Sequence, residues 1–327
     1  MFPILSISDK FCAKIRNQKK QSLLLQKVYI MSFITDNTKE KTLSARILLY
    51  LFFLFFSLLL GSLVSVVITK FMSSGSNALK LSQGISSTLM FVAPPLMLYF
   101  FTRKNPLQQI GFTKPNNAIV VLGGILVMFI SLPTINLLTS WNENIQLPAS
   151  LAKIEKVFKS MEETAAELTE QMLNVDNIGG LIINLIVIAL IPAIGEELTF
   201  RGVVQQFLTK TCKNAHVAII LSAAIFSAIH FQFYGFLPRM VLGVFLGYFF
   251  YMTKSLWTSI LMHFANNALA VTAYYLNNIG VIDIDVDSVG ATQWHITIIS
   301  AIGCISLIVY SWHKMKAEND NHQILNN

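Results

Sequence analysis

Long apolar runs separated by short polar segments dominate the pattern along the chain. Eight of these runs are candidate helices, and all but the fourth have roughly 17–25 residues, the length that crosses a hydrocarbon core of about 30 Å. Their approximate limits are residues 46–69, 84–102, 117–140, 178–208, 215–233, 236–253, 256–276 and 294–312. The pattern therefore predicts an all-α fold, a polytopic membrane helix bundle with about eight transmembrane helices.

These runs also divide the chain. A basic arm at residues 1–45 precedes a membrane domain at 46–312, and a tail at 313–327 follows it. The arm has no apolar core long enough for a signal peptide, and Met31 offers an alternative start. The arm and the tail are both expected to be cytoplasmic.

One loop of the membrane domain, at about residues 149–174, has a different pattern. Its apolar residues recur every three or four positions, with charged residues between them. This spacing predicts an amphipathic helix outside the membrane. We interpret it as a helix packed on the bundle or lying on the membrane surface, and a lid that guides substrate is the alternative.

Composition narrows the class of protein. Hydrophobic residues make up 54% of the chain and charged residues only 13%, whereas soluble domains carry about 25% charged residues. Together with a mean hydropathy of +0.59, these values exclude a disordered chain, a coiled coil and a typical soluble enzyme. The lipid bilayer is therefore an expected partner.

The net charge of +7 does not indicate nucleic-acid binding, because the basic residues lie before and between the apolar runs rather than on one face. If the N-terminus is cytoplasmic, most of the 24 lysine and arginine residues fall on the cytoplasmic side. The sequence thus predicts an integral membrane protein with both termini in the cytoplasm. We expect the membrane to be a bacterial inner membrane.

Ionisable residues occur inside the apolar runs, where each costs roughly 2.5–3.5 kcal/mol at a helix centre and usually marks a function. The fourth run contains Glu196, Glu197 and Arg201. Glu197 and Arg201 are expected to pair on one helical face, which leaves Glu196 available for chemistry. Pro192 and Gly195 are expected to loosen the helix just before the two carboxylates.

Two later runs each contain a histidine. His230 follows Phe226 by one helical turn, and His263 precedes Asn267 by one turn, whereas Asn266 is expected to point elsewhere. A single histidine in such a run is more often a hydrogen-bonded packing residue than a catalyst. The combination with the acidic pair and Arg201 indicates a functional site instead, and we expect the polar groups to converge around one pocket.

This set of groups suits attack of water on a peptide carbonyl. A carboxylate and an imidazole can remove a proton from water, while a second imidazole and an asparagine amide can stabilise an oxyanion. The same groups equally suit a divalent ion, with Glu196, His230 and His263 as ligands and one position open to water. The protease signatures HExxH and GxSxG are absent from the sequence.

In order and spacing, the three segments resemble the motifs of the CAAX protease and bacteriocin-processing family, a family of intramembrane proteases. The family patterns EExxxR, FxxxH and HxxxN correspond to Glu196 to Arg201, Phe226 to His230 and His263 to Asn267. The resemblance covers about residues 178–276, which would form the catalytic core.

This resemblance implies roles for the matching residues. Glu196 and His230 would activate the attacking water. His263 and Asn267 would stabilise the oxyanion or assist metal binding. Glu197, Arg201 and Phe226 would be supporting residues. Because the family is commonly described as metalloproteases, it also implies a divalent metal, with zinc as the candidate.

We therefore expect an intramembrane endopeptidase that cleaves a membrane-associated peptide or protein near its end. A proton-coupled transporter is an alternative, because buried Glu, His and Arg also form proton relays. Against it, no internal repeat relates the runs, as it does in many carriers. A non-catalytic immunity or scaffold protein that keeps the motifs for binding is the other alternative.

Overall fold

The structure of the chain is a computed structural model, and it describes residues 42–72, 75–102, 105–115, 117–283, 289–290 and 293–325. Within these ranges, the regular elements are helices and no strand is present. The predicted all-α helix bundle is therefore confirmed. Most of the predicted basic arm lies outside the described residues.

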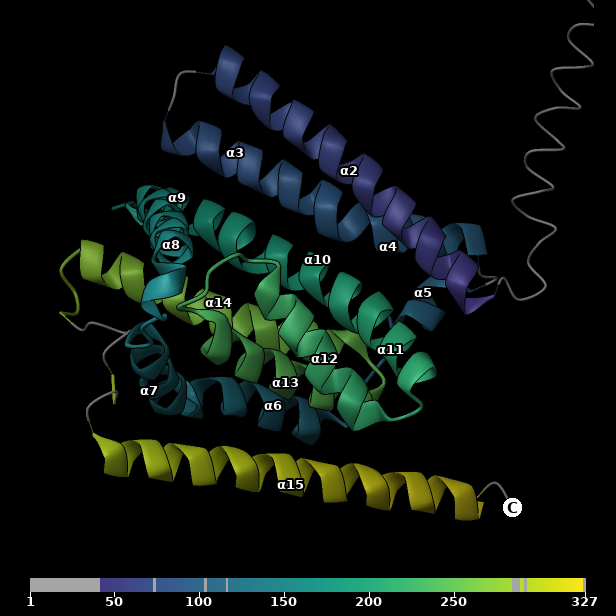
Figure 1. Ribbon diagram of the computed structural model, residues 1–327. Coiled ribbons are helices and arrows are strands. Elements are labelled where there is room, and N and C mark those ends of the chain that lie inside the picture. The colour runs from purple at the N-terminus through teal and green to yellow at the C-terminus, as the bar shows by residue number, and fades with distance from the viewer. Residues whose placement is uncertain are drawn as a thin grey trace, which may run out of the picture.

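A helical hairpin begins the described chain (Figure 1). Helix α2 (Leu43–Phe71) starts at Thr42, whose side-chain oxygen accepts a hydrogen bond from the N–H of Ala45. The chain then returns through α3 (Ser76–Ser87), the π-helical turn η2 (Thr88–Val92), α4 (Ala93–Thr102) and the short α5 (Pro106–Ile110). Pro94 and Pro95 open α4 without backbone donors, which explains the irregular turn before it.

A bent pair of helices accounts for the predicted run at 117–140. Helices α6 (Ala118–Ile130) and α7 (Leu132–Glu143) meet at an angle of 45°. Pro133 lies in the first turn of α7, where its missing N–H interrupts the helical hydrogen bonds. The 3₁₀ turn η3 (Ala149–Leu151) then leads into helix α8 (Ala152–Leu173).

Helix α8 confirms the predicted amphipathic helix, and only part of its apolar stripe packs on the bundle. Ile154, Val157 and Met161 of its apolar stripe are exposed. The side that contacts the bundle carries Phe158, whose ring stacks on Phe233 with centroids 5.4 Å apart. The outward apolar stripe favours a helix that lies on the membrane surface, and its role as a lid remains a prediction.

One irregular helical rod and four further helices complete the described chain. The rod consists of α9 (Ile178–Asn184), the π-helical turn η4 (Leu185–Leu190), α10 (Ile191–Thr199), the π-helical turn η5 (Phe200–Val204) and α11 (Gln205–Cys212). The four helices are α12 (Ala215–Ala228), α13 (Phe236–Thr253), α14 (Leu256–Asn278) and α15 (Trp294–Leu325). The predicted tail from residue 313 thus continues the last helix.

These elements are layered, with α10 to α14 between the hairpin of α2 and α3 on one side and α6, α7 and α15 on the other (Figure 1). Two groups of buried apolar side chains join the layers. The first includes Phe53, Tyr99, Leu198, Phe250 and Ile260. The second includes Val127, Phe249, Met262, Cys304 and Met315. The central helices are therefore held from both sides.

Five helices of the described chain are long and apolar enough to cross a membrane, and six if the bent pair forms one span. They are Leu43–Phe71, Ser76–Thr102, Ile178–Cys212, Phe236–Thr253 and Trp294–Glu318, with α6 and α7 as the bent pair. Helix α12 is too short for this test, and α14 carries several polar residues. The integral membrane character is confirmed, whereas eight crossings remain a prediction.

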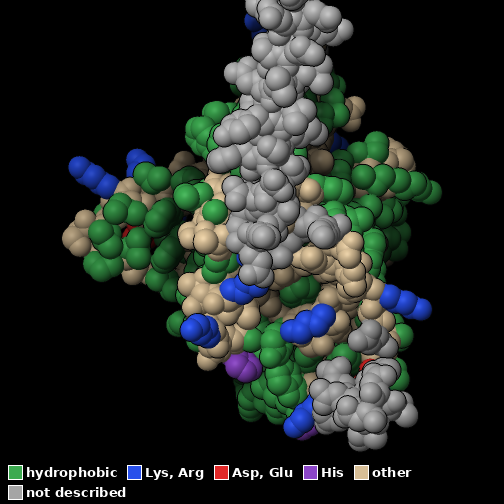
Figure 2. Space-filling view, turned by 90° about the vertical axis from the view of Figure 1, so that its right-hand side faces the viewer, with side chains coloured by type: hydrophobic (Ala, Val, Ile, Leu, Met, Phe, Trp, Pro, Cys, Tyr) green, Lys and Arg blue, Asp and Glu red, His purple; other side chains and the backbone are tan. Residues whose placement is uncertain are grey.

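Basic residues gather at one end of the bundle. Figure 2 looks onto this end, and lysine or arginine side chains surround it. Lys210 and Lys213 lie at the end of α11, and Lys254 caps the end of α13. All three are among the lysine and arginine residues predicted to be cytoplasmic. The bundle places them at the same end, as that prediction requires. The orientation itself remains a prediction.

Candidate active site

The two adjacent glutamates lie in α10, between two π-helical turns. Pro192 lies in the first turn of this helix and η4 ends just before it, as expected for a residue without an N–H. Single π-helical turns are frequent at functional sites. Gly195 has a different role from the one predicted, because a Cβ atom there would lie 2.8 Å from the Cβ of Phe91. This glycine permits close packing of α10 on η2 and thereby fixes the position of Glu196.

Glu197 is fully buried and forms the predicted pair with Arg201. Arg201 Nη1 donates to Glu197 Oε1 at 2.7 Å, and Nη2 donates to the carbonyl oxygen of Gly243 at 2.8 Å. Both side chains are shielded from solvent. A buried ion pair of this kind fixes geometry, because removal of either partner leaves the other charge uncompensated.

The helix that receives Arg201 carries two glycines four residues apart. Gln205 repeats the arrangement one turn later, since its Nε2 donates to the carbonyl oxygen of Gly247 at 3.1 Å. A Cβ atom at Gly247 would lie 2.9 Å from Ile219 of α12. The small-xxx-small spacing lets helices approach closely, and here it also exposes two carbonyl groups to side chains from the neighbouring rod.

The same carboxylate that pairs with Arg201 also orients a histidine. His263 Nδ1 is 2.9 Å from Glu197 Oε1. Because Arg201 holds this glutamate as a carboxylate, the oxygen accepts and Nδ1 is the donor. In the neutral imidazole, Nε2 then has a free lone pair, and it lies 3.8 Å from Glu196 Oε2.

His230 lies at the end of a helix rather than inside one. The predicted helix at 215–233 ends at Ala228, and Phe231 has a left-handed backbone with φ 55°. His230 Nδ1 donates to the carbonyl oxygen of Phe226 at 2.8 Å, a group that the ending helix leaves without a partner. Since a carbonyl can only accept, Nε2 of a neutral His230 also has a free lone pair.

Phe226 packs between the charged groups. Its ring meets those of His230 and His263 edge to face, with centroids 5.3 Å and 6.0 Å away. The Arg201 guanidinium lies 5.2 Å from its ring centroid. The predicted supporting residue therefore contacts both histidines and the cation that neutralises Glu197.

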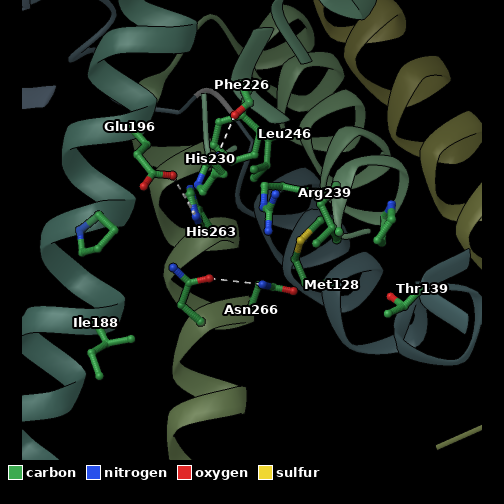
Figure 3. A pocket seen from close by; sticks show the side chains of 15 residues that line it. Met128, Thr139, Ile188, Glu196, Phe226, His230, Arg239, Leu246, His263 and Asn266 are labelled. Atoms are coloured by element: carbon green, nitrogen blue, oxygen red, sulfur yellow. Dashed lines mark hydrogen bonds and ion pairs between the residues drawn. The ribbon is translucent and has the colours of Figure 1, made fainter. Parts of the chain in front are cut away.

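All four residues predicted to act in catalysis line one cavity of about 440 Å³ (Figure 3). Its polar lining consists of Thr139, Glu196, His230, Arg239, His263, Asn266 and Asn267. The expectation for Asn266 was wrong: it lines the same cavity, and its Nδ2 donates to Asn267 Oδ1 at 3.2 Å. That bond occupies the Asn267 oxygen and leaves the Asn267 N–H groups available as donors.

Glu196 differs from its neighbour Glu197 in its contacts: Glu197 contacts Arg201 and His263 at hydrogen-bond distance, whereas Glu196 has no such contact among the described residues. Figure 3 shows its carboxylate directed into the cavity, toward His263. Among the described residues, its closest charged contact is His263 Nε2 at 3.8 Å, which is too long for a direct hydrogen bond. The Glu197 carboxylate thus holds Arg201 and His263 in place, whereas the Glu196 carboxylate lies in the cavity without a direct hydrogen bond from the described residues.

The three predicted metal ligands, Glu196, His230 and His263, fit zinc in kind. They offer one carboxylate and two free imidazole nitrogens, which suits zinc. In the described part of the chain, no three His, Cys, Asp or Glu side chains form a group that could hold a metal ion. The catalytic steps proposed for this site use protein side chains and water.

Two features of the cavity were missed by the sequence argument. Arg239 was not among the residues predicted for the site, yet it lines the cavity from the first turn of α13. The glycine pair at 243 and 247 was not recognised. The GxxxG spacing in an apolar helix was the available signal for the glycines, whereas the sequence offered none for the direction of Arg239.

Fold and site together define a membrane-embedded helical bundle with an acid–base cavity among its central helices. Residues 178–269 match the family model described as type II CAAX prenyl endopeptidase Rce1-like. The matched segment runs from α9 into α14 and contains the four residues above. The recognition from three motifs is therefore confirmed over this segment: residues 178–269 are similar to the CAAX protease family, and the match supports a hydrolase of the CAAX-protease type. No curated protein and no solved structure matches the chain significantly.

Proposed function

We propose that the chain is an endopeptidase that hydrolyses a peptide bond of a membrane-associated peptide or protein, with water activated by Glu196 and His230. One observation carries this proposal: Glu196 faces the cavity without a hydrogen-bond partner among the described residues, while Glu197 beside it is neutralised by Arg201.

The proposed roles of the residues follow from their donor and acceptor atoms that have no hydrogen-bond partner among the described residues. A water molecule in the cavity has two protons, and the Glu196 carboxylate and His230 Nε2 are two acceptors with no other partner among the described residues. Glu196 takes one proton as the water oxygen attacks the carbonyl carbon of the substrate. Asn267 Nδ2 donates to the oxyanion that forms.

Collapse of the tetrahedral intermediate requires a proton on the leaving amine. Glu196 returns the proton that it took from water, so the reaction consumes one water and leaves the enzyme unchanged. His263, held by Glu197, can stabilise the protonated Glu196 or take part in this transfer through Nε2. Glu197, Arg201 and Phe226 act by holding the two imidazole rings in place.

The setting of the reaction is part of the proposal. The cavity lies among helices of an integral membrane protein, so we infer a substrate at the membrane. We propose cytoplasmic termini on the grounds of the charge distribution, and a bacterial inner membrane as the location. The family match names a prenyl endopeptidase, but nothing in the cavity identifies a lipid-modified substrate.

The test is cleavage of a peptide library by the purified full-length chain in detergent or liposomes. Products are identified by mass spectrometry, and Glu196→Gln is the inactive control because it keeps the side-chain shape. We expect cleavage by the wild type and none by Glu196→Gln. Equal cleavage by both would refute the proposed mechanism, and flux across liposomes without hydrolysis would favour a transporter.

A further inference from the structure

Arg239 has an unused donor in the cavity. Its Nη2 donates to Gln232 Oε1 at 2.6 Å. Its Nη1 is buried and has no hydrogen-bond partner. Among the described residues no carboxylate forms an ion pair with Arg239, although the guanidinium remains charged at any accessible pH. A half-buried cation with a buried N–H group that lacks a partner is costly unless a ligand completes it.

The surrounding structure holds this side chain in one position. Asn142 of α7, itself buried, donates to the carbonyl oxygen of Phe233 at 2.9 Å and accepts from the N–H of Leu237 at 2.9 Å. These two bonds fix the loop and the start of the helix that carry Gln232 and Arg239. The free donor is therefore preorganised, which lowers the cost of binding a ligand there.

Position and chemistry together identify the ligand. Arg239 lines the same cavity as Glu196 and His230 (Figure 3). The apolar part of the cavity lining includes Leu242 and Leu246 of the same helix. A guanidinium beside apolar side chains suits a carboxylate attached to an apolar peptide end, because a guanidinium N–H binds a carboxylate by a charge-assisted hydrogen bond.

We propose that Arg239 binds a carboxylate of the substrate close to the scissile bond and thereby selects which peptides are cleaved. The inference rests on the proposed function. The carboxylate belongs either to the free C-terminus of the substrate or to an acidic side chain near it. Both sources offer the same chemistry to Arg239, and the peptides below separate them.

The experiment compares matched peptides on the wild type and on Arg239→Gln. One pair differs only in a free acid or an amide at the C-terminus, and a second pair, amidated, differs in Asp or Asn near the cleaved bond. A hydrogen bond to a charged group predicts a wild-type preference in kcat/KM of about 10–100-fold for the carboxylate peptide of one pair. In Arg239→Gln we expect that ratio to approach one, mainly through a higher KM.

A second variant, Gly235→Ala, keeps the positive charge of Arg239 but shifts its position. A Cβ atom at Gly235 would lie 3.0 Å from Arg239 Nη2, so in Gly235→Ala the guanidinium must shift by a few tenths of an ångström from its place beside Gln232. We expect the carboxylate preference to fall here too. If Arg239→Gln does not fold, this variant still tests the proposal.

Each outcome has a distinct meaning. A wild type that cleaves acid and amide, and Asp and Asn, equally well overturns the role of Arg239 but not the proteolysis. An Arg239→Gln variant whose kcat falls equally for every peptide places Arg239 at the oxyanion and also overturns the proposal. A wild type that cleaves no peptide contradicts the proposed function itself.

Discussion

His263 Nδ1 lies 2.9 Å from Glu197 Oε1, across 66 residues of sequence. The carboxylate oxygen that accepts from His263 also accepts from Arg201 at 2.7 Å. One buried carboxylate thus fixes the tautomer of an imidazole from α14 and the position of a guanidinium in its own rod. Glu197 is therefore a positioning residue, and Glu196 is the residue left free to act.

The first prediction separates the two neighbouring glutamates by activity. We expect Glu196→Gln to lower kcat by at least about 100-fold, the contribution of a general base, with little change in melting temperature. Peptide turnover and thermal unfolding in detergent measure the two effects. A variant that keeps at least half of the wild-type turnover would show that Glu196 is not the base.

The second prediction concerns the buried ion pair. Arg201→Ala leaves the fully buried Glu197 carboxylate without its cation, and we expect it to lower the free energy of unfolding by about 3–5 kcal/mol. The matched control is Lys159→Ala in α8. Lys159 also pairs with a glutamate four residues away, Glu155, but its side chain is 55% exposed, compared with 1% for Arg201.

For the exposed pair we expect a change of about 0–1 kcal/mol. Both variants are compared by chemical or thermal unfolding under the same detergent conditions. Equal effects of the two substitutions would contradict the difference in burial on which the prediction rests.

The third prediction tests the close approach of α10 to η2. Gly195→Ala places a Cβ atom 2.8 Å from the Cβ of Phe91, so the two backbones must separate. We expect a loss of about 1–3 kcal/mol in stability and a loss of turnover, because Glu196 moves with the helix. The control is Gly61→Ala, where the nearest atom lies 3.8 Å away and the substitution should be neutral or slightly stabilising.

The fourth prediction concerns metal ions. Because no three His, Cys, Asp or Glu side chains of the described residues form a group that could hold a metal ion, we expect peptide cleavage to survive chelators such as EDTA and phenanthroline. Elemental analysis of the same sample gives an independent readout. Loss of activity on chelation, with recovery on addition of zinc, would instead establish the ion that the family resemblance implied.

The fifth prediction concerns the contact of α8 with the loop after His230. Glu155 Oε1 accepts a hydrogen bond from the hydroxyl of Tyr234 at 3.3 Å. The hydrogen bond from Lys159, followed by the charge of Lys159, lowers the pKa of Glu155. A lowered pKa in the folded state adds stability above the ordinary pKa of the group, and this stability is lost as the pH falls through the lowered value.

We therefore expect α8 to become more mobile only under strongly acidic conditions. A fluorophore attached at the exposed Ser160 reports this mobility through its anisotropy. Glu155→Gln should remove the pH-dependent change, whereas Glu163→Gln should retain it. An unchanged transition in Glu155→Gln would assign the effect to another group.

Part of the site could be derived from sequence because its geometry is local. Glu197 and Arg201 lie four residues apart in one helical rod, so their pairing follows from the helical repeat. The link between Phe226 and His230 also spans four residues, although its form differs, because the helix ends at Ala228 and the histidine caps it. Local spacing predicted the contact but not the end of the helix.

The remaining contacts depend on how separate helices pack. The direction of Arg239, the place of Asn266 in the cavity and the close contact of Gly195 with Phe91 all involve elements far apart in the chain. Helical periodicity predicts which residues share a face of a helix, but it does not predict which neighbouring helix that face contacts. The outward apolar stripe of α8 is a further case, because the sequence left open whether this stripe packs on the bundle or lies on the membrane surface.

By itself, the sequence determined the membrane class, the all-α fold and the family resemblance, because long apolar runs and ordered motifs are properties of the linear chain. Only the tertiary structure decided that Glu197 orients His263, that Glu196 remains without a partner, and that Arg239 enters the same cavity. Those relationships arise where glycines let helix backbones approach and where buried charges must find partners in other helices, and neither condition is visible in one segment alone.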